Sequence, residues 1–188
     1  VPRVNDEDKL RVIPNFVDTE SLYPTARNNS YRRELGLTDE TIVMYAGNVG
    51  FSQPLELIVE AARQFRDRDD VVFVINGDGS RRAHFETEAE QLPNVTFMEY
   101  QPRNRLNELL AAGDIHLVPL QPGMGSISVP SKIYSILAAG RPVLASVDPG
   151  TEIDLVVTRS GAGRSVPAGD TAAFIDALSA LIDDPNGC

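Results

Sequence analysis

Four polar residues lie on one side of a predicted helix in the C-terminal half of the chain, namely Ser128, Ser131, Lys132 and Ser135. They fall at helical spacing, and the line begins where unpaired backbone N–H groups and the positive end of the helix dipole collect. A lysine is unfavourable at that end of a helix unless an anion is held there, because the anion then faces both the ammonium group and the N–H groups. The spacing therefore predicts an anion site with Lys132 as its cation.

The same pattern has a plainer interpretation that the sequence leaves open. Lys132 would then be a solvated lysine whose aliphatic stem covers apolar surface, and the serines would be helix caps or surface residues. The other side of the helix carries apolar or small residues at core-facing spacing, which are Ile133, Ile136, Leu137 and Gly140. The helix is therefore expected to pack on a core and to end at Gly140, whichever role its polar side has.

Other catalytic chemistries find little support in the residue pattern. His116 lies within an apolar run and is expected to be a hydrogen-bonded core histidine, whereas His84 is expected on the surface. No two histidines or carboxylates stand at metal-ligand spacing, and the single cysteine is the terminal Cys188. No Gly-x-Ser-x-Gly motif is present, which disfavours a serine-triad hydrolase. We therefore expect neither a metal nor another cofactor.

The composition is that of one globular domain spanning residues 1–188, with 42% hydrophobic and 23% charged residues. Its formal net charge of −10 argues against nucleic-acid binding, which needs a basic surface, so an anionic ligand must be held by local groups. No apolar run approaches the length of a transmembrane segment, and no signal peptide is recognisable. The chain starts with Val1 rather than methionine, which suggests a piece cut from a longer polypeptide.

Short apolar, β-rich runs alternate with amphipathic helical patterns along the chain. After a short apolar run at 10–14, the predicted strands are 41–46, 71–75, 95–99, 114–120, 142–146 and 163–166. Besides the helix that Gly140 ends, the predicted helices are 54–66, about 80–92, 105–112, 152–158 and 171–182. Ser80 and Thr151 are predicted N-caps, with Asp154 completing a capping box. This alternation predicts an α/β, Rossmann-like, doubly wound parallel sheet of about six strands.

The ligand site of such a sheet lies beyond the carboxyl ends of its strands. Five segments rich in glycine and small polar residues fall there, which are Gly47–Gly50, Asn76–Gly79, Tyr100–Pro102, Gln121–Lys132 and Val147–Thr151. Such residues let the backbone approach a ligand, although the first two segments are also typical of ordinary turns. A dinucleotide fingerprint is not supported, since its third glycine and its acidic residue are absent.

Four segments carry longer motifs: RVIPNFVD (11–18) with LYP (22–24), MYAGNVGFSQPLELIVEAA (44–62), NVTFMEYQPRNRLNELLAAGDIHLVPL (94–120) and PSKIYSILAAGRPVLAS (130–146). In this order they resemble the C-terminal, donor-binding domain of family-four glycosyltransferases with the GT-B fold. The last segment resembles a block of the bacterial members that build surface polysaccharides and glycolipids. The resemblance covers nearly the whole chain, and the motifs are specific when they are taken together.

The resemblance implies an enzyme of two Rossmann-like domains. This chain would bind a UDP- or GDP-sugar, and an N-terminal domain of the same polypeptide would bind the acceptor. Enzymes similar to it need no essential metal and commonly retain anomeric configuration. The protein would then position the donor and stabilise negative charge on the leaving diphosphate, for which Lys132 is the candidate. The isolated domain is expected to bind nucleotide without turnover.

The resemblance also assigns substrate contacts. Asn48 and Gln53 stand where many relatives carry a basic pair at the diphosphate, and Tyr100-Gln101 stands where relatives hold the nucleobase. Ile127 and Ser135 replace two glutamates of many relatives, so both carboxylates are lost and only Ser135 can bond a ribose hydroxyl. The further candidates at the rim and the helix start are Gly50, Gly77, Ser126, Ser128 and Ser131.

Two other functions stay open at this stage. The missing glutamates also fit a catalytically degenerate binding or regulatory module, which would release no nucleotide from a donor. A nucleotide-sugar epimerase has the same fold and would act on UDP-N-acetylglucosamine without an acceptor. The resemblance places the protein in the cytoplasm. Lipid-linked acceptors would draw it to the inner face of the membrane as a peripheral protein, although no amphipathic basic anchor is present.

Overall fold

The computed structural model describes residues 11, 13, 15–125 and 127–184, so most of the predicted apolar run at 10–14 and the candidate Ser126 lie outside the described residues. Six parallel strands form one sheet in the order β3-β2-β1-β4-β5-β6. The strands are β1 (Thr41–Ala46), β2 (Val71–Asn76), β3 (Val95–Met98), β4 (Ile115–Pro119), β5 (Val143–Val147) and β6 (Gly163–Pro167). The predicted α/β, doubly wound parallel sheet is therefore confirmed.

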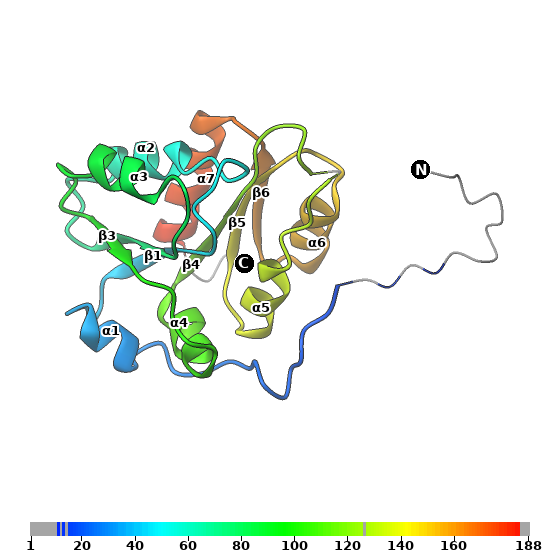
Figure 1. Cartoon of the computed structure of the whole chain (residues 1–188), viewed down its shortest axis with the longest axis horizontal. Helices are drawn as coiled ribbons and strands as arrows, with labels where there is room; N and C mark the ends of the chain where they lie inside the picture. Colours follow the sequence, from blue (N-terminus) through cyan, green and yellow to red (C-terminus); the bar gives the residue numbers. More distant parts are fainter. Residues whose placement is uncertain (1–10, 12, 14, 126, 185–188) are drawn as a thin grey trace.

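Helices connect the strands and cover both faces of the sheet (Figure 1). They are α1 (Ser30–Glu34), α2 (Glu56–Gln64), α3 (Arg82–Glu88), α4 (Leu106–Ala112), α5 (Lys132–Ala138), α6 (Glu152–Ser160) and α7 (Thr171–Asp183), with a short 3-10 helix, η2 (Arg103–Arg105), before α4. In the part of the chain that the structure describes, no helix has both the length and the hydropathy needed to cross a bilayer.

Each strand contributes side chains to two separate cores because neighbouring residues on a strand point to opposite faces. On β1, Val43 and Tyr45 join the cluster formed with α2, α3 and α7, whereas Ile42 and Met44 join the cluster formed with α1, α4, α5 and α6. All four residues are almost fully buried. This explains why the strand reads as a continuous apolar run rather than as an alternating one.

The predicted helix starts are only partly correct. Helix α3 begins at Arg82 without a side-chain cap, so the prediction of Ser80 as its N-cap is wrong. Thr151 does occupy the N-cap position of α6, but its hydroxyl donates to the carbonyl of Asp148 at 2.7 Å. Asp154 accepts a hydrogen bond from the backbone N–H of Gly150, also at 2.7 Å. Local turn bonds thus replace the predicted capping box.

Helix α5 confirms its predicted packing face. Ile133 and Ile136 are buried, and Leu137 is half-buried. Gly140 has a φ of +67°, a left-handed conformation that favours glycine and ends the helix. Lys132, at the start of the helix, therefore lies at the carboxyl ends of the strands. Arg141, just after the end of the helix, lies at their amino ends.

Candidate functional site

A cavity of about 240 Å³ lies at the carboxyl ends of the strands, beside the point where the strand order reverses between β1 and β4. In open α/β sheets this switch point is where ligands bind. The lining comes from the ends of β1 and β2, the segment after β3, and helices α4 and α5. Among its polar or glycine residues are Gly47, Asn76, Tyr100, Gln101, Lys132 and Ser135.

Lys132 supplies the positive charge of this cavity. Its Nζ atom lies 3.8 Å from the centroid of the Tyr45 ring and 3.4 Å from the carbonyl oxygen of Ala46. No carboxylate among the described residues forms an ion pair with it. Burial lowers the pKa of Lys132 to about 7, because a desolvated ammonium group without a counter-charge is disfavoured. Lys132 is half-buried and its ammonium group lies against the Tyr45 ring, which favours a cation of the cavity over a solvated surface lysine.

The turns after β1 and β2 approach each other through their backbones beside Lys132. Gly77 has a φ of +153°, and a Cβ atom there would fall 1.9 Å from the carbonyl oxygen of Gly47. The buried Tyr45 hydroxyl donates to the carbonyl of Asn48 at 2.6 Å and so holds the first turn in place. Gly77 thus has a structural reason to be glycine, and it does not itself line the cavity.

Hydrogen bonds between strand ends position the residues at the other side of the cavity. The Asn76 side chain donates to the carbonyl of Glu99, as does the side chain of Gln101 at 3.1 Å. The Arg82 guanidinium donates to two further carbonyls at the ends of β2 and β3. Tyr100, 55% exposed, stands at the rim, and the apolar floor beneath it is formed by Leu106, Leu109 and Leu110 of α4.

The predicted polar stripe is divided by the fold. Lys132 and Ser135 line the cavity, whereas Ser128, Ser131 and Ile127 do not. Ser131 is exposed and makes no side-chain cap to α5, and Ile127 is 79% exposed. The preceding loop is held by Asp148, whose carboxylate accepts N–H bonds from Gly123 and Gly125.

Three further predicted contacts belong to the loop between β1 and α2, next to the cavity but not in its lining. Asn48 is exposed, Gly50 is buried, and Gln53 is half-buried. The Oε1 atom of Gln53 is buried without a hydrogen-bond partner. A buried unpaired polar atom is costly, which makes Gln53 the member of this loop most in need of a partner.

His116 is fully buried on β4, and its Nε2 atom lies 2.9 Å from the carbonyl oxygen of Leu110. Burial lowers the pKa of His116 to about 4, so the ring is neutral near pH 7. The prediction of a hydrogen-bonded core histidine is confirmed for Nε2, whereas Nδ1 is buried without a partner. Among the described residues, no three His, Cys, Asp or Glu side chains are grouped as a metal site.

A second cavity of about 770 Å³ adjoins the first and shares Leu106 and Ser135 with it. Its other lining comes from the segment 16–22, from η2 and from α4, including Arg103, Asn104 and Asn107. The residue pattern gave no reason to select these three side chains, since none lies in a glycine-rich turn at a strand end. The RVIPNFVD motif was the available signal, because its last residues line this cavity.

Comparisons with known proteins agree on one family. Residues 40–184 match the model of the family described as "Glycosyl transferases group 1". The chain is 30% identical over 185 residues to the Pseudomonas aeruginosa protein named "Probable glycosyltransferase WbjE". That match includes 97% of this chain but 45% of the relative, so the chain spans less than half of the relative's length.

Solved structures share the fold at lower sequence identity. WaaG, described as a glycosyltransferase involved in lipopolysaccharide biosynthesis, is 20% identical with a TM-score of 0.76, over 95% of this chain and 48% of WaaG. Anabaena Alr3699/HepE, solved in complex with UDP, is 19% identical with a TM-score of 0.72, over 94% of this chain and 49% of HepE. Both matches extend over about half of the larger protein.

Proposed function

Because the chain belongs to the Glycosyl transferases group 1 family, we propose that it is the C-terminal, donor-binding domain of an enzyme that transfers a sugar from a nucleoside-diphosphate sugar. An N-terminal domain of the same polypeptide would bind the acceptor. The relatives' greater length supports this division, since the chain matches less than half of WbjE and about half of WaaG. The involvement of WaaG in lipopolysaccharide biosynthesis supports a glycan or lipid-linked acceptor.

The observation that carries the proposal is the buried, unpaired ammonium group of Lys132 at the switch point of the sheet. A diphosphate placed beside it would provide the counter-charge that the protein does not. The interaction would be strong because the group is shielded from water. As the glycosyl bond breaks, negative charge grows on the leaving diphosphate, and a fixed cation stabilises this transition state. Helix α5 has seven residues, so the ammonium group rather than the helix dipole is the main source of stabilisation.

The opposite end of the cavity suits the nucleoside. Tyr100 and Gln101 would face the base, the leucines of α4 would contact its ring, and the Ser135 hydroxyl would bond the ribose. In this arrangement Ser135 offers the ribose a neutral hydroxyl instead of a carboxylate. Ribose contacts would then contribute less to affinity than in relatives with glutamate, because hydrogen bonds to charged groups are the stronger ones. We further propose that configuration is retained and that no metal is required.

Isothermal titration of the 188-residue chain with UDP and with GDP tests donor binding. We expect at least one of them to bind with and without EDTA, and Lys132→Met to weaken that binding by about 100-fold, as expected for losing a buried charge-assisted contact. Arg159→Met is the matched control, because it removes an exposed cation on α6 away from the cavity. No binding of either nucleotide, or equal binding by Lys132→Met, would refute the proposal.

Turnover requires the longer polypeptide. A protein that includes the N-terminal domain is expected to release nucleotide from the donor when a lipid extract supplies the acceptor, whereas the 188-residue chain should not. Anomeric NMR of the product would report retention. Incubation with UDP-N-acetylglucosamine alone separates this activity from that of an epimerase, which needs no acceptor. Donor binding without nucleotide release from the longer protein would instead indicate a degenerate binding module.

A further inference from the structure

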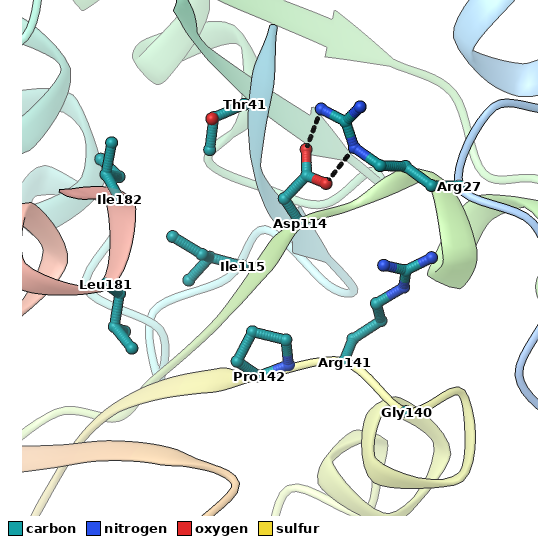
Figure 2. Close-up of a pocket in the computed structure, with 9 residues that line it drawn as sticks. All are labelled: Arg27, Thr41, Asp114, Ile115, Gly140, Arg141, Pro142, Leu181 and Ile182. Carbon is teal, nitrogen blue, oxygen red and sulfur yellow. Dashed lines mark hydrogen bonds and ion pairs between the residues drawn. The ribbon is translucent and has the colours of Figure 1, made fainter. Parts of the chain in front are cut away.

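A third cavity, of about 420 Å³, lies at the amino ends of β1, β4 and β5, whereas the candidate donor site lies at the carboxyl ends of the strands. Figure 2 shows its lining, in which charged and polar groups of Arg27, Thr41, Asp114 and Arg141 face apolar side chains such as Leu181. Thr41 is the first residue of β1, whereas Ala46 at the other end of this strand lines the donor cavity. The two cavities are therefore separated by the length of a strand.

Two arginines next to this cavity, Arg32 and Arg27, already form ion pairs and hydrogen bonds within the protein. Arg32 is 1% exposed and pairs with Asp114, and it also donates to the carbonyls of Ala112, Thr38 and Glu40. The Arg27 guanidinium pairs with the same Asp114 carboxylate, as the dashed lines in Figure 2 mark. That carboxylate further accepts the backbone N–H of Ile42. The single carboxylate is thus already shared between two guanidinium groups.

Arg141 is the third arginine of this cavity edge, and it lacks comparable partners. Its Nε atom is buried without a hydrogen-bond partner, and its only protein hydrogen bond among the described residues is a long one of 3.5 Å from Nη2 to the carbonyl of Thr25. Desolvation lowers its pKa, and the charges that act on it are those of Asp114 and Arg27. In the lining of the cavity, the guanidinium groups of Arg27 and Arg141 therefore face the single carboxylate of Asp114, which leaves an excess of one positive charge.

We propose that this cavity is a second ligand site that binds a phosphate monoester with a small apolar body, with Arg141 as its main partner. A phosphate monoester carries close to two negative charges and three acceptor oxygens at pH 7, so it can bond Arg141 and a further donor at once, for which a carboxylate has fewer oxygens. The planar guanidinium fork suits two phosphate oxygens at once. The Thr41 hydroxyl adds a donor, and Ile115, Pro142 and Leu181 form the apolar wall for the body of the ligand.

Binding of phenyl phosphate, inorganic phosphate and benzoate to the 188-residue chain tests this site. The titrations use the Lys132→Met background, so that the donor cavity lacks its cation and the outcome does not depend on the proposed function. We expect phenyl phosphate to bind more tightly than inorganic phosphate, and both to bind more tightly than benzoate. Arg141→Gln should weaken phenyl phosphate binding by about tenfold or more, whereas the exposed control Arg159→Gln should leave it unchanged.

Thr41→Val is the second variant, because it keeps the shape of a side chain in the cavity while it removes one donor. We expect it to weaken phenyl phosphate binding by roughly threefold with an unchanged melting temperature, so the site stays testable if Arg141→Gln does not fold. Equal binding by Thr41→Val and its parent would overturn the proposal. So would undetectable phenyl phosphate binding at about 10 mM, or tighter binding of benzoate than of phenyl phosphate.

Discussion

The two ends of strand β1 both hold buried positive charge, but they hold it in opposite ways. At the Thr41 end, Arg32 is bonded to Asp114 and to three carbonyls, so its guanidinium is saturated by the protein. At the Ala46 end, the ammonium group of Lys132 contacts only the Tyr45 ring and, at 3.4 Å, the carbonyl oxygen of Ala46 among the described residues, and burial lowers its pKa to about 7. The first arrangement stabilises the fold, whereas the second leaves a charge that no carboxylate among the described residues compensates.

This contrast separates residues whose charge the protein itself satisfies from residues that we propose to bind a ligand. Breaking a buried ion pair strongly destabilises a protein, because the charge of the remaining partner is left uncompensated. A buried cation without a counter-ion already costs stability, so its removal should do the opposite. Variants at the two ends of β1 should therefore change the free energy of unfolding with opposite signs.

The largest expected effect is that of Asp114→Asn. This change removes the carboxylate shared by Arg27 and Arg32 and should lower the free energy of unfolding by about 3–5 kcal/mol, as measured by urea denaturation. Asp70→Asn is the matched control, because it breaks the exposed pair with Arg68 and should barely move the midpoint. Equal losses in the two variants would show that burial of the pair is unimportant.

Lys132→Met should raise the free energy of unfolding while it removes nucleotide binding. The pKa of the lysine falls from 10.5 to about 7 on folding, so removing the charge should contribute roughly 2–4 kcal/mol at pH 7, part of it offset by the lost contact with Tyr45. The gain should be near its full value below about pH 7 and should decline as the pH rises to 10.5, because the unfolded state binds more protons only between these values. A destabilised Lys132→Met protein at pH 6 would contradict this account.

The affinity for UDP should decrease as the pH rises above 7. Below that value the ammonium group is already charged, but above it binding must first take up a proton, which costs up to about tenfold per pH unit. The terminal phosphate of UDP loses its last proton at about pH 6, and further ionisation would strengthen binding to a cation, so the phosphates do not produce the same trend. Titration calorimetry in buffers of different ionisation enthalpy measures the proton uptake, which should approach one per UDP at pH 8.5. An affinity that is flat between pH 7 and 9 would exclude this role of Lys132.

The smallest effect is expected for Ser135→Ala. Its hydroxyl lines the donor cavity without a charge, so its loss should weaken UDP binding by roughly threefold to tenfold and leave the melting temperature unchanged. Ser131→Ala, on the exposed side of the same helix start, should have no effect on the titration. If Ser131→Ala weakened UDP binding as much as Ser135→Ala, the division of the polar stripe by the fold would be disproved.

The fold was predictable because its signals are local and repeated. Continuous apolar runs at 41–46 and 71–75 and an amphipathic pattern at 54–66 do not depend on distant contacts, and all three became the expected elements. Helix starts were less predictable, since the side chain of Thr151 bonds to Asp148 instead of capping α6. Turn bonds of this kind compete with caps at similar energy, and the sequence does not rank them.

The sequence predicted a residue of the candidate site only where that residue's position in a predicted helix is unfavourable without a ligand. Lys132 was conspicuous because a cation at a helix start is unfavourable by itself, and the structure places it in the cavity. Helical spacing put Ser131 on the same stripe, but the depth of the cavity beside Ser135 depends on how α4 packs against α5. Arg141 was not selected as a site residue, because its missing partner becomes visible only once Asp114 is seen to be occupied by two other arginines.

The protonation of Lys132, with and without UDP, tests the central claim most directly. The sequence has two lysines, Lys9 and Lys132, so NMR of lysines labelled with ¹³C at Cε should show two signals, and Lys132→Met assigns them. We expect one signal to titrate near pH 7 in the free chain and to stay in its charged form beyond pH 8.5 when UDP is bound. A Lys132 signal that titrates near pH 10.5 and does not respond to UDP would contradict the account.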